Sequence, residues 1–262
     1  MISRSVAIAL ATHLFISTAA ALPARPPSYD WLKGRKAEDD LARRFAPPPG
    51  AERVKTSGFG EWLRHLPLLP PDTQVQLFDG TLKARQEVHA AVVDLDVGTR
   101  DLQQCADAVM RLRAEYLYAG GRPVEFHPDP GKKTALRFEG HERARFQKYL
   151  IRLFADAGSA SLQAELRPIS SHRIQPGDVL IQGGYPGHAV LVLDVAEGAG
   201  GEQFLMLGQS YMPAQQFHVL KNMGSASLSP WYPAADLEAG LATPEWRPFH
   251  WPDVRRFGDP QR

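Results

Sequence analysis

The chain cannot form an internal disulfide bond, because Cys105 is the only cysteine among its 262 residues. The net charge is +1 and no basic stripe with interleaved aromatic residues is present, so a nucleic-acid partner is not expected. GxSxG, phosphate-loop and dinucleotide-binding motifs are absent too, which removes support for serine hydrolases and nucleotide-dependent enzymes. The histidines and carboxylates show no compact metal-ligand spacing, and we expect neither a metal nor a cofactor.

The N-terminus has the three parts of a secretory signal peptide. Arg4 supplies a positive charge, residues 6–16 form a short apolar run, and small residues follow at 18–21. We therefore expect residues 1–22 to be a cleaved signal peptide and the mature protein to be secreted or periplasmic. The apolar run is shorter than the roughly 20 residues that span a bilayer, so no stable membrane insertion is expected after cleavage.

A linker and one domain are expected after this leader. Residues 23–57 include the proline-rich stretch "APPPGAERVKT" and few apolar residues, which is typical of a linker. Residues 58–262 suit a single domain, and the chain's hydrophobic content of 44% is sufficient for a sizeable core. The tail from Ser227 is rich in proline and is expected to wrap the domain as irregular chain.

The periodicity of the apolar residues predicts an α+β fold. Spacings of three and four residues predict helices at 101–119 and at about 142–157, with a short third helix in "SASLQAELRPI". Apolar runs predict strands at 73–80 and 87–97, and then at "DVLIQ", "HAVLVLDVA", "FLMLGQ" and "QFHVL". Helices followed by antiparallel strands indicate a helix packed on an antiparallel sheet.

Cys105 is a candidate nucleophile, because it falls in the first turn of the helix predicted to start at Asp101. Asp101 and Gln104 have capping-box spacing, and the free N–H groups of a helix start favour a thiolate. Cys105 also lies on the apolar face of that helix, and free cysteine is among the most buried residue types. Taken alone, this position favours a structural cysteine.

His188 and Gln209 are the candidate partners of Cys105. His188 begins an apolar strand, and Gln209 follows an apolar strand that we expect beside it. An amide oxygen at Gln209 can accept from one ring nitrogen of His188, which fixes the tautomer and aims the other nitrogen at a thiol. A packed core histidine and an ordinary polar residue at a strand end are the alternatives.

The order of these residues resembles that of papain-like cysteine hydrolases. The stretch "GDVLIQGGYPGHAVLVLDV" is similar to NlpC-type and CHAP-type cell-wall amidases, in which a Gly-Asp turn starts one strand and Gly-His starts the next. The equivalent positions here are Gly177-Asp178 and Gly187-His188. From about Ser57 onward the chain also resembles an exported bacterial family known as a domain of unknown function, on "LQQCADAVMRLRAEYLY" and "QSYMPAQQFHVLKN".

The papain-like resemblance implies a function and a set of site residues. It implies that Cys105 is the nucleophile, that His188 is the general base and that Gln209 orients the imidazole. Substrate contacts are expected at Gln104, and at Tyr211 and Gln215 in the "QSYMPAQ" cluster. A packed turn is the alternative for this cluster. The expected activity is cleavage of an amide bond in cell-wall (peptidoglycan) peptide, or in a protein substrate, by an exported hydrolase.

Two departures from the amidase pattern leave a non-catalytic alternative open. The sequence has Gln104-Cys105-Ala106-Asp107 where those enzymes usually have Asp-Cys-Ser-Gly, and the separation of Cys105 from His188 is long. A helix starting at Asp101 would also use the Cys105 N–H internally, so catalysis requires the helix to begin nearer Gln103 or Gln104. A cell-envelope binding module on the same fold would need none of this chemistry.

Overall fold

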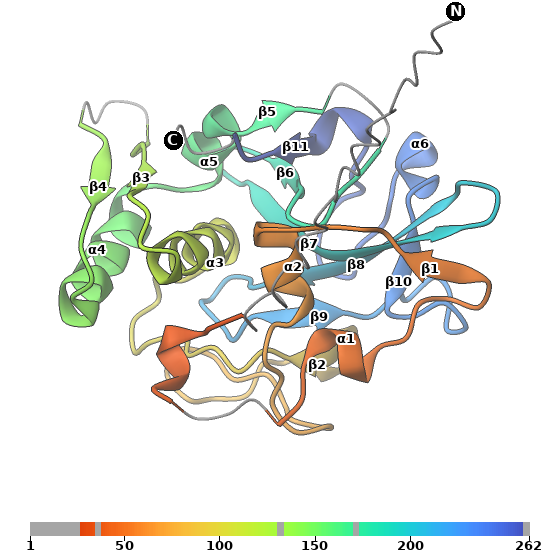
Figure 1. Ribbon diagram of the computed structural model, residues 1–262, viewed down its shortest axis with the longest axis horizontal. Helices are drawn as coiled ribbons and strands as arrows, with labels where there is room; N and C mark the ends of the chain where they lie inside the picture. Colours follow the sequence, from red (N-terminus) through yellow and green to blue (C-terminus); the bar gives the residue numbers. More distant parts are fainter. Residues whose placement is uncertain (1–26, 35–37, 130–133, 170–172, 259–262) are drawn as a thin grey trace, which may run out of the picture.

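The computed structural model describes residues 27–34, 38–129, 134–169 and 173–258 (Figure 1). It confirms the α+β class. In these residues one sheet has nine strands in the order β2-β9-β8-β7-β6-β11-β5, with β1 beside β7 and β10 beside β8, all antiparallel. The strands are β1 (Ala51–Arg53), β2 (His89–Val92), β5 (Arg167–Pro168), β6 (Val179–Gln182), β7 (His188–Gly198), β8 (Gln203–Gln209), β9 (His218–Leu220), β10 (Trp231–Pro233) and β11 (Val254–Arg256).

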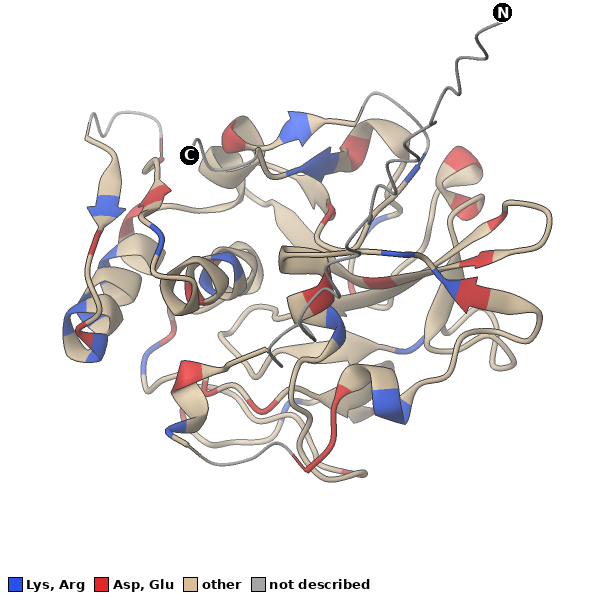
Figure 2. Ribbon diagram, viewed as in Figure 1, with Lys and Arg blue, Asp and Glu red and all other residues tan. Residues whose placement is uncertain are grey.

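The helices gather beside this sheet. Figure 1 shows α3, α4 and the β3–β4 hairpin grouped on one side of the molecule, with the nine-stranded sheet on the other. Acidic and basic residues are spread over the whole ribbon (Figure 2), in keeping with the small net charge. The remaining elements are α1 (Leu41–Arg44), α2 (Phe59–Arg64), α3 (Cys105–Ala119), β3 (Val124–Phe126), β4 (Leu136–Phe138), α4 (Arg143–Asp156), α5 (Ser159–Glu165), α6 (Asp236–Ala239) and 3-10 turns η1 (Asp30–Leu32), η2 (Gln86–Val88) and η3 (Trp251–Asp253).

Strand β7 is buried on both faces, which explains its unbroken apolar sequence. Ala189 and Leu191 join the hydrophobic cluster that includes the inner face of α3. Val190 and Val192 point the opposite way, into a second cluster built from β8 and the C-terminal segment. Because side chains alternate along a strand, His188 lies on the side of Val190, away from α3.

Several predicted elements differ from the observed ones. The helix predicted from Asp101 begins at Cys105, since Asp101 turns its carboxylate to the backbone N–H of Ala214 at 2.7 Å instead of capping a helix. The strand predicted at 73–80 is wrong, because its residues form only isolated bridges to Leu82 and Gln215. The strand predicted at 87–97 is reduced to β2 and follows a 3-10 turn. The helices predicted near 142–157 and 159 are confirmed as α4 and α5.

Both ends of the domain are more ordered than expected. The predicted signal peptide, residues 1–22, lies outside the described residues. Within the stretch expected to be a linker, β1 pairs with β7, and Trp31 and Leu41 are buried. The C-terminal tail does wrap the domain, but it adds β10 and β11 to the sheet.

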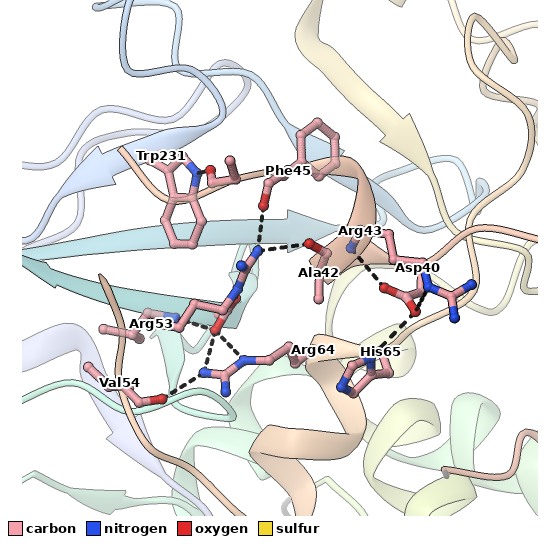
Figure 3. Close-up of polar contacts among 12 residues, drawn as sticks. Asp40, Ala42, Arg43, Phe45, Arg53, Val54, Arg64, His65 and Trp231 are labelled. Carbon is pink, nitrogen blue, oxygen red and sulfur yellow. Dashed lines mark hydrogen bonds and ion pairs between the residues drawn. The ribbon is translucent and has the colours of Figure 1, made fainter. Parts of the chain in front are cut away.

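A buried carboxylate on β7 holds the N-terminal segment in place. Asp194 lies at an irregularity in the β7–β8 pairing, and its side chain is 1% exposed. It accepts hydrogen bonds from Arg53 Nε at 2.6 Å, and from Arg64 Nε and Nη2 at 2.9 and 2.7 Å. Both arginines also bond to backbone carbonyls, Arg64 to that of Val54 and Arg53 to that of Phe45 (Figure 3). One side chain of β7 therefore fixes β1 and α2 to the sheet.

Replacing this carboxylate should destabilise the fold strongly. We expect Asp194→Asn to lower the free energy of unfolding by about 3–5 kcal/mol, because Arg53 and Arg64 lose the buried carboxylate that they share, while the remaining ion pair of Arg64, with Glu61, is partly exposed. Urea denaturation of the variant and the wild type measures the difference. The control is Glu87→Gln, which removes a pair with Arg85 that is about half exposed and should cost at most about 0.5 kcal/mol. Equal losses for the two variants would contradict the role of Asp194.

Candidate functional site

Cys105 is the first residue of α3, and its backbone N–H precedes the first hydrogen bond of the helix. That first bond runs from the Ala108 N–H to the Gln104 carbonyl at 2.9 Å. The Asp107 carboxylate caps the start by accepting from the Gln104 N–H at 3.1 Å. The N–H of Cys105 is therefore not used within the helix, which removes the obstacle raised by a helix that starts at Asp101.

The thiol of Cys105 is buried and neutral. Burial raises its pKa to about 11, although the N–H groups of Ala189, Ala106 and Cys105 itself favour the thiolate. The Cys105 Sγ lies 4.0 Å from the Gly187 carbonyl oxygen. Contacts with Gly187 and Ala189 place the sulfur against the backbone on either side of His188.

His188 is buried, and its pKa is lowered to about 4 by desolvation, which outweighs its hydrogen bond to Gln209. Its Nε2 lies 2.9 Å from Gln209 Oε1. The rings of Tyr211 and Trp246 pack against it, with centroid separations of 5.1 Å each. The imidazole is therefore neutral and held in one orientation.

Glu245 determines which way the Gln209 amide points. Gln209 Nε2 donates to Glu245 Oε2 at 2.8 Å, and the other carboxylate oxygen of Glu245 accepts from the buried ammonium of Lys83. Because an ionised carboxylate only accepts, the amide nitrogen must face Glu245 and the amide oxygen must face His188. His188 then carries its proton on Nε2, and Nδ1 is left with a lone pair.

The thiol and the imidazole are not hydrogen-bonded to each other. Nδ1 of His188 is buried and has no hydrogen-bond partner within the described part of the chain. The ring points to the face of the sheet opposite α3, whereas Cys105 reaches the start of β7 from the α3 side. The Cys105 thiol and the His188 imidazole thus both lie at the start of β7, but no hydrogen bond joins them.

The three expected substrate-binding residues lie at different depths. Tyr211 is half-buried beside His188, and its hydroxyl donates to the Glu245 carbonyl oxygen at 2.8 Å. Gln104 precedes Cys105 and donates from its side chain to Asp101 Oδ1 at 2.9 Å. Gln215 is 1% exposed, so its side chain lies beneath the loop that follows β8 and not at the protein surface. Only Tyr211 contacts the imidazole.

Sequence reasoning missed Lys83, Glu245 and Trp246. Glu245 and Trp246 fall in the proline-rich tail, where no periodicity marks a residue as inward-facing. Lys83 lies in an irregular segment after the isolated bridges, and its burial beside Glu245 depends on the tertiary fold.

The described residues contain no group of three His, Cys, Asp or Glu side chains that is suited to a metal ion. Among the same residues, no helix has the length and apolar character needed to cross a bilayer.

Comparison with known proteins identifies the family. The family described as "Domain of unknown function (4846)" matches residues 41–138 and 129–256. The chain belongs to this family. No curated protein and no solved structure matches the chain. The family match includes Cys105, His188 and Gln209, and its description assigns them no activity. The likeness to papain-like enzymes gains no support from these comparisons and stays a prediction.

The burial of His188 predicts a pH-dependent stability. Its pKa is about 4 in the folded protein and about 6.5 in an unfolded chain, so between these values only the unfolded chain binds the proton. The free energy of unfolding should therefore fall as the pH decreases from about 6.5 to 4, by up to about 1.4 kcal/mol per pH unit from this residue. Urea titrations should show a smaller decrease for His188→Gln than for the wild type. Identical decreases would mean that folding does not change the pKa of His188.

Proposed function

We propose that the protein is an exported thiol hydrolase that cleaves amide bonds in peptide, with cell-wall peptide as its expected substrate. The observation that supports this most is the state of His188: Nε2 is fixed by Gln209, and Nδ1 is an unpartnered acceptor at the strand end where the Cys105 thiol lies.

The proposed reaction starts from a neutral pair. Burial keeps the Cys105 thiol protonated and the His188 imidazole unprotonated, so Nδ1 takes the thiol proton as the sulfur attacks the substrate carbonyl. The N–H of Cys105, free of helix bonds, is available to the developing oxyanion at the positive end of α3. Nδ1 then gives its proton to the leaving amine as the carbon–nitrogen bond breaks, which leaves a thioester on Cys105.

Water completes the cycle. His188 Nδ1 takes a proton from water as its oxygen attacks the thioester, the carbon–sulfur bond breaks, and the proton returns to the Cys105 sulfur. The charge on the imidazole during both steps is stabilised by Gln209 Oε1, which is held in place by Glu245 and Lys83. Glu245 and Lys83 are thus positioning residues that act through Gln209.

Substrate access requires side chains to move. Cys105 is 6% exposed and His188 is fully buried. Tyr211 and Trp246 pack against the imidazole, and both are only partly buried. The thiol and Nδ1 approach the start of β7 from opposite faces of the sheet, so contact requires two changes. We propose that a bound peptide displaces one of these rings and that the start of β7 then turns Nδ1 of His188 toward the thiol.

Digestion of purified cell wall tests this function. We expect the wild-type protein to generate new amine ends, and Cys105→Ala and His188→Gln to reduce their rate of appearance by about 100-fold or more. His127→Gln is the matched control, because it removes an exposed histidine that contacts Glu165 on α5. Amine release that survives the loss of Cys105 would overturn the assignment.

The unmade bond between thiol and imidazole favours one alternative, a non-catalytic module that binds the cell envelope. In that case the protein would bind cell-wall fragments with equal affinity before and after Cys105→Ala, and no new amine ends would appear. Sedimentation with purified cell wall, run beside the digestion, distinguishes the two functions.

A further inference from the structure

Residues 183–187 connect β6 to β7, and the end of this loop lies against the Cys105 thiol. The Gly187 carbonyl oxygen lies 4.0 Å from Cys105 Sγ, and His188 follows Gly187 directly as the first residue of β7. Cys105 is 6% exposed. A displacement of this loop would therefore change both the exposure of the thiol and the orientation of His188.

The loop contributes little to the hydrophobic core, unlike the strands that it joins. Leu180 on β6 and Val190 on β7 are fully buried. In contrast, residues 183–186 are half-buried or exposed, and Tyr185 is 78% exposed. Segments that bury little apolar surface open at a low cost in free energy while the core stays folded. The loop can therefore move while β6 and β7 remain paired.

Hydrogen bonds to α5 hold the loop in its closed position. Ser159 Oγ donates to the Gly184 carbonyl oxygen at 3.1 Å and accepts from the Gly184 N–H at 3.3 Å. Gln163 Oε1 accepts from the Gly183 N–H at 2.6 Å. A Cβ at Gly187 would lie 2.1 Å from Ser159 Oγ, so glycine is required there for this close approach. The start of α5 thus binds both ends of the loop beside the thiol.

The Tyr185 hydroxyl adds a bond to the opposite side of the loop by donating to the Asp129 carboxylate. Asp129 follows β3, and its backbone N–H donates to the Asp156 carbonyl oxygen at the end of α4 at 2.9 Å. The carboxylate also lies beside Gly158, where a Cβ would be 3.4 Å from Asp129 Oδ2. Asp129 is therefore fixed to the helices. Because the Tyr185 ring is exposed, its position depends on the hydroxyl bond more than on burial.

We infer that residues 183–187 form a lid over the Cys105 thiol, which the Tyr185–Asp129 and Ser159–Gly184 hydrogen bonds keep closed. The glycines at 183, 184 and 187 lie at the two ends of the loop, where they give the backbone the freedom that a hinge requires. Opening of the lid uncovers the sulfur and allows the start of β7 to turn the His188 ring. The purpose of the lid, admission of a peptide substrate, rests on the proposed function, whereas its opening can be measured without substrate.

The rate at which iodoacetamide alkylates Cys105, with no substrate present, tests the lid. We expect Tyr185→Phe to raise this rate about threefold to fivefold, because it removes one closing hydrogen bond and keeps the exposed ring. Ser159→Ala should have a similar effect, and the two substitutions together should raise the rate about tenfold or more. Tyr118→Phe is the matched control. It removes a hydroxyl bond to the His141 carbonyl oxygen from the same helix as Cys105, and the rate should stay unchanged.

A second pair of variants tests the bond between Tyr185 and Asp129 itself. Asp129→Ala should raise the alkylation rate as much as Tyr185→Phe, and the double variant should be no faster than either, because both substitutions remove the same hydrogen bond. Wild-type rates in both Tyr185→Phe and Ser159→Ala would overturn the inference. An equal rise in Tyr118→Phe would also overturn it, by showing that general loosening exposes the thiol. Circular dichroism confirms that each variant is folded.

The lid and the hydrolysis fail in distinguishable ways. Faster alkylation of Tyr185→Phe, together with no release of amine ends from cell wall by the wild type, would support the lid and contradict the hydrolase. Amine release by the wild type, together with unchanged alkylation of Tyr185→Phe and Ser159→Ala, would overturn the lid and leave the hydrolase in place.

Discussion

The pairing of β7 with its neighbours on both edges is the constraint on which the candidate site depends. Gln182 opposes His188 on one edge, and Gly208 opposes Leu191 on the other, so the start of β7 and the end of β8 lie together. A slip of one residue would turn His188 to the face of α3 and away from Gln209, because side chains alternate along a strand. The apolar core on both faces of β7 opposes that slip, since it would transfer every buried side chain to the wrong cluster.

Strand β7 takes part in buried ionic and hydrogen-bond networks at two places. At its irregularity, Asp194 binds two arginines and fixes the N-terminal segment. At its start, His188 depends through Gln209 on the Glu245–Lys83 pair, whose side chains are 7% and 6% exposed. Buried ion pairs add little net stability, because desolvation offsets their attraction. Here the second pair has a different consequence, namely a single orientation of the Gln209 amide and hence a single tautomer of His188.

The sequence predicts local structure well wherever packing and periodicity agree. Helix α4 was predicted nearly to the residue, because Phe146, Tyr149 and Leu153 are spaced for one buried face. The predicted start of α3 is wrong, because the spacing of Asp101 and Gln104 is that of a capping box. The Asp101 carboxylate instead accepts a hydrogen bond from the backbone N–H of Ala214. In the segment 73–80, the apolar residues predict a strand, but only single bridges form.

For the candidate site, the sequence indicates the contact between His188 and Gln209 but not the Glu245–Lys83 pair that orients the Gln209 amide. That contact follows from two adjacent apolar strands, each with a polar residue at its end. Glu245 and Lys83 are 162 positions apart in the sequence, and each lies in an irregular segment where no pattern of period two or 3.6 marks it. The face on which His188 lies also depends on the strand register, which a single sequence does not specify.

The measurement that tests the Cys105–His188 pair most directly is the rate at which iodoacetamide alkylates the thiol near neutral pH. Because the chain has one cysteine, the mass of the adduct reports Cys105 alone. If Nδ1 of His188 is the base for this thiol, the rate in His188→Gln should fall by about tenfold or more relative to the wild type. Equal rates in both proteins, rising with pH as expected for an isolated thiol with a pKa of about 11, would show that Cys105 is a packed structural residue.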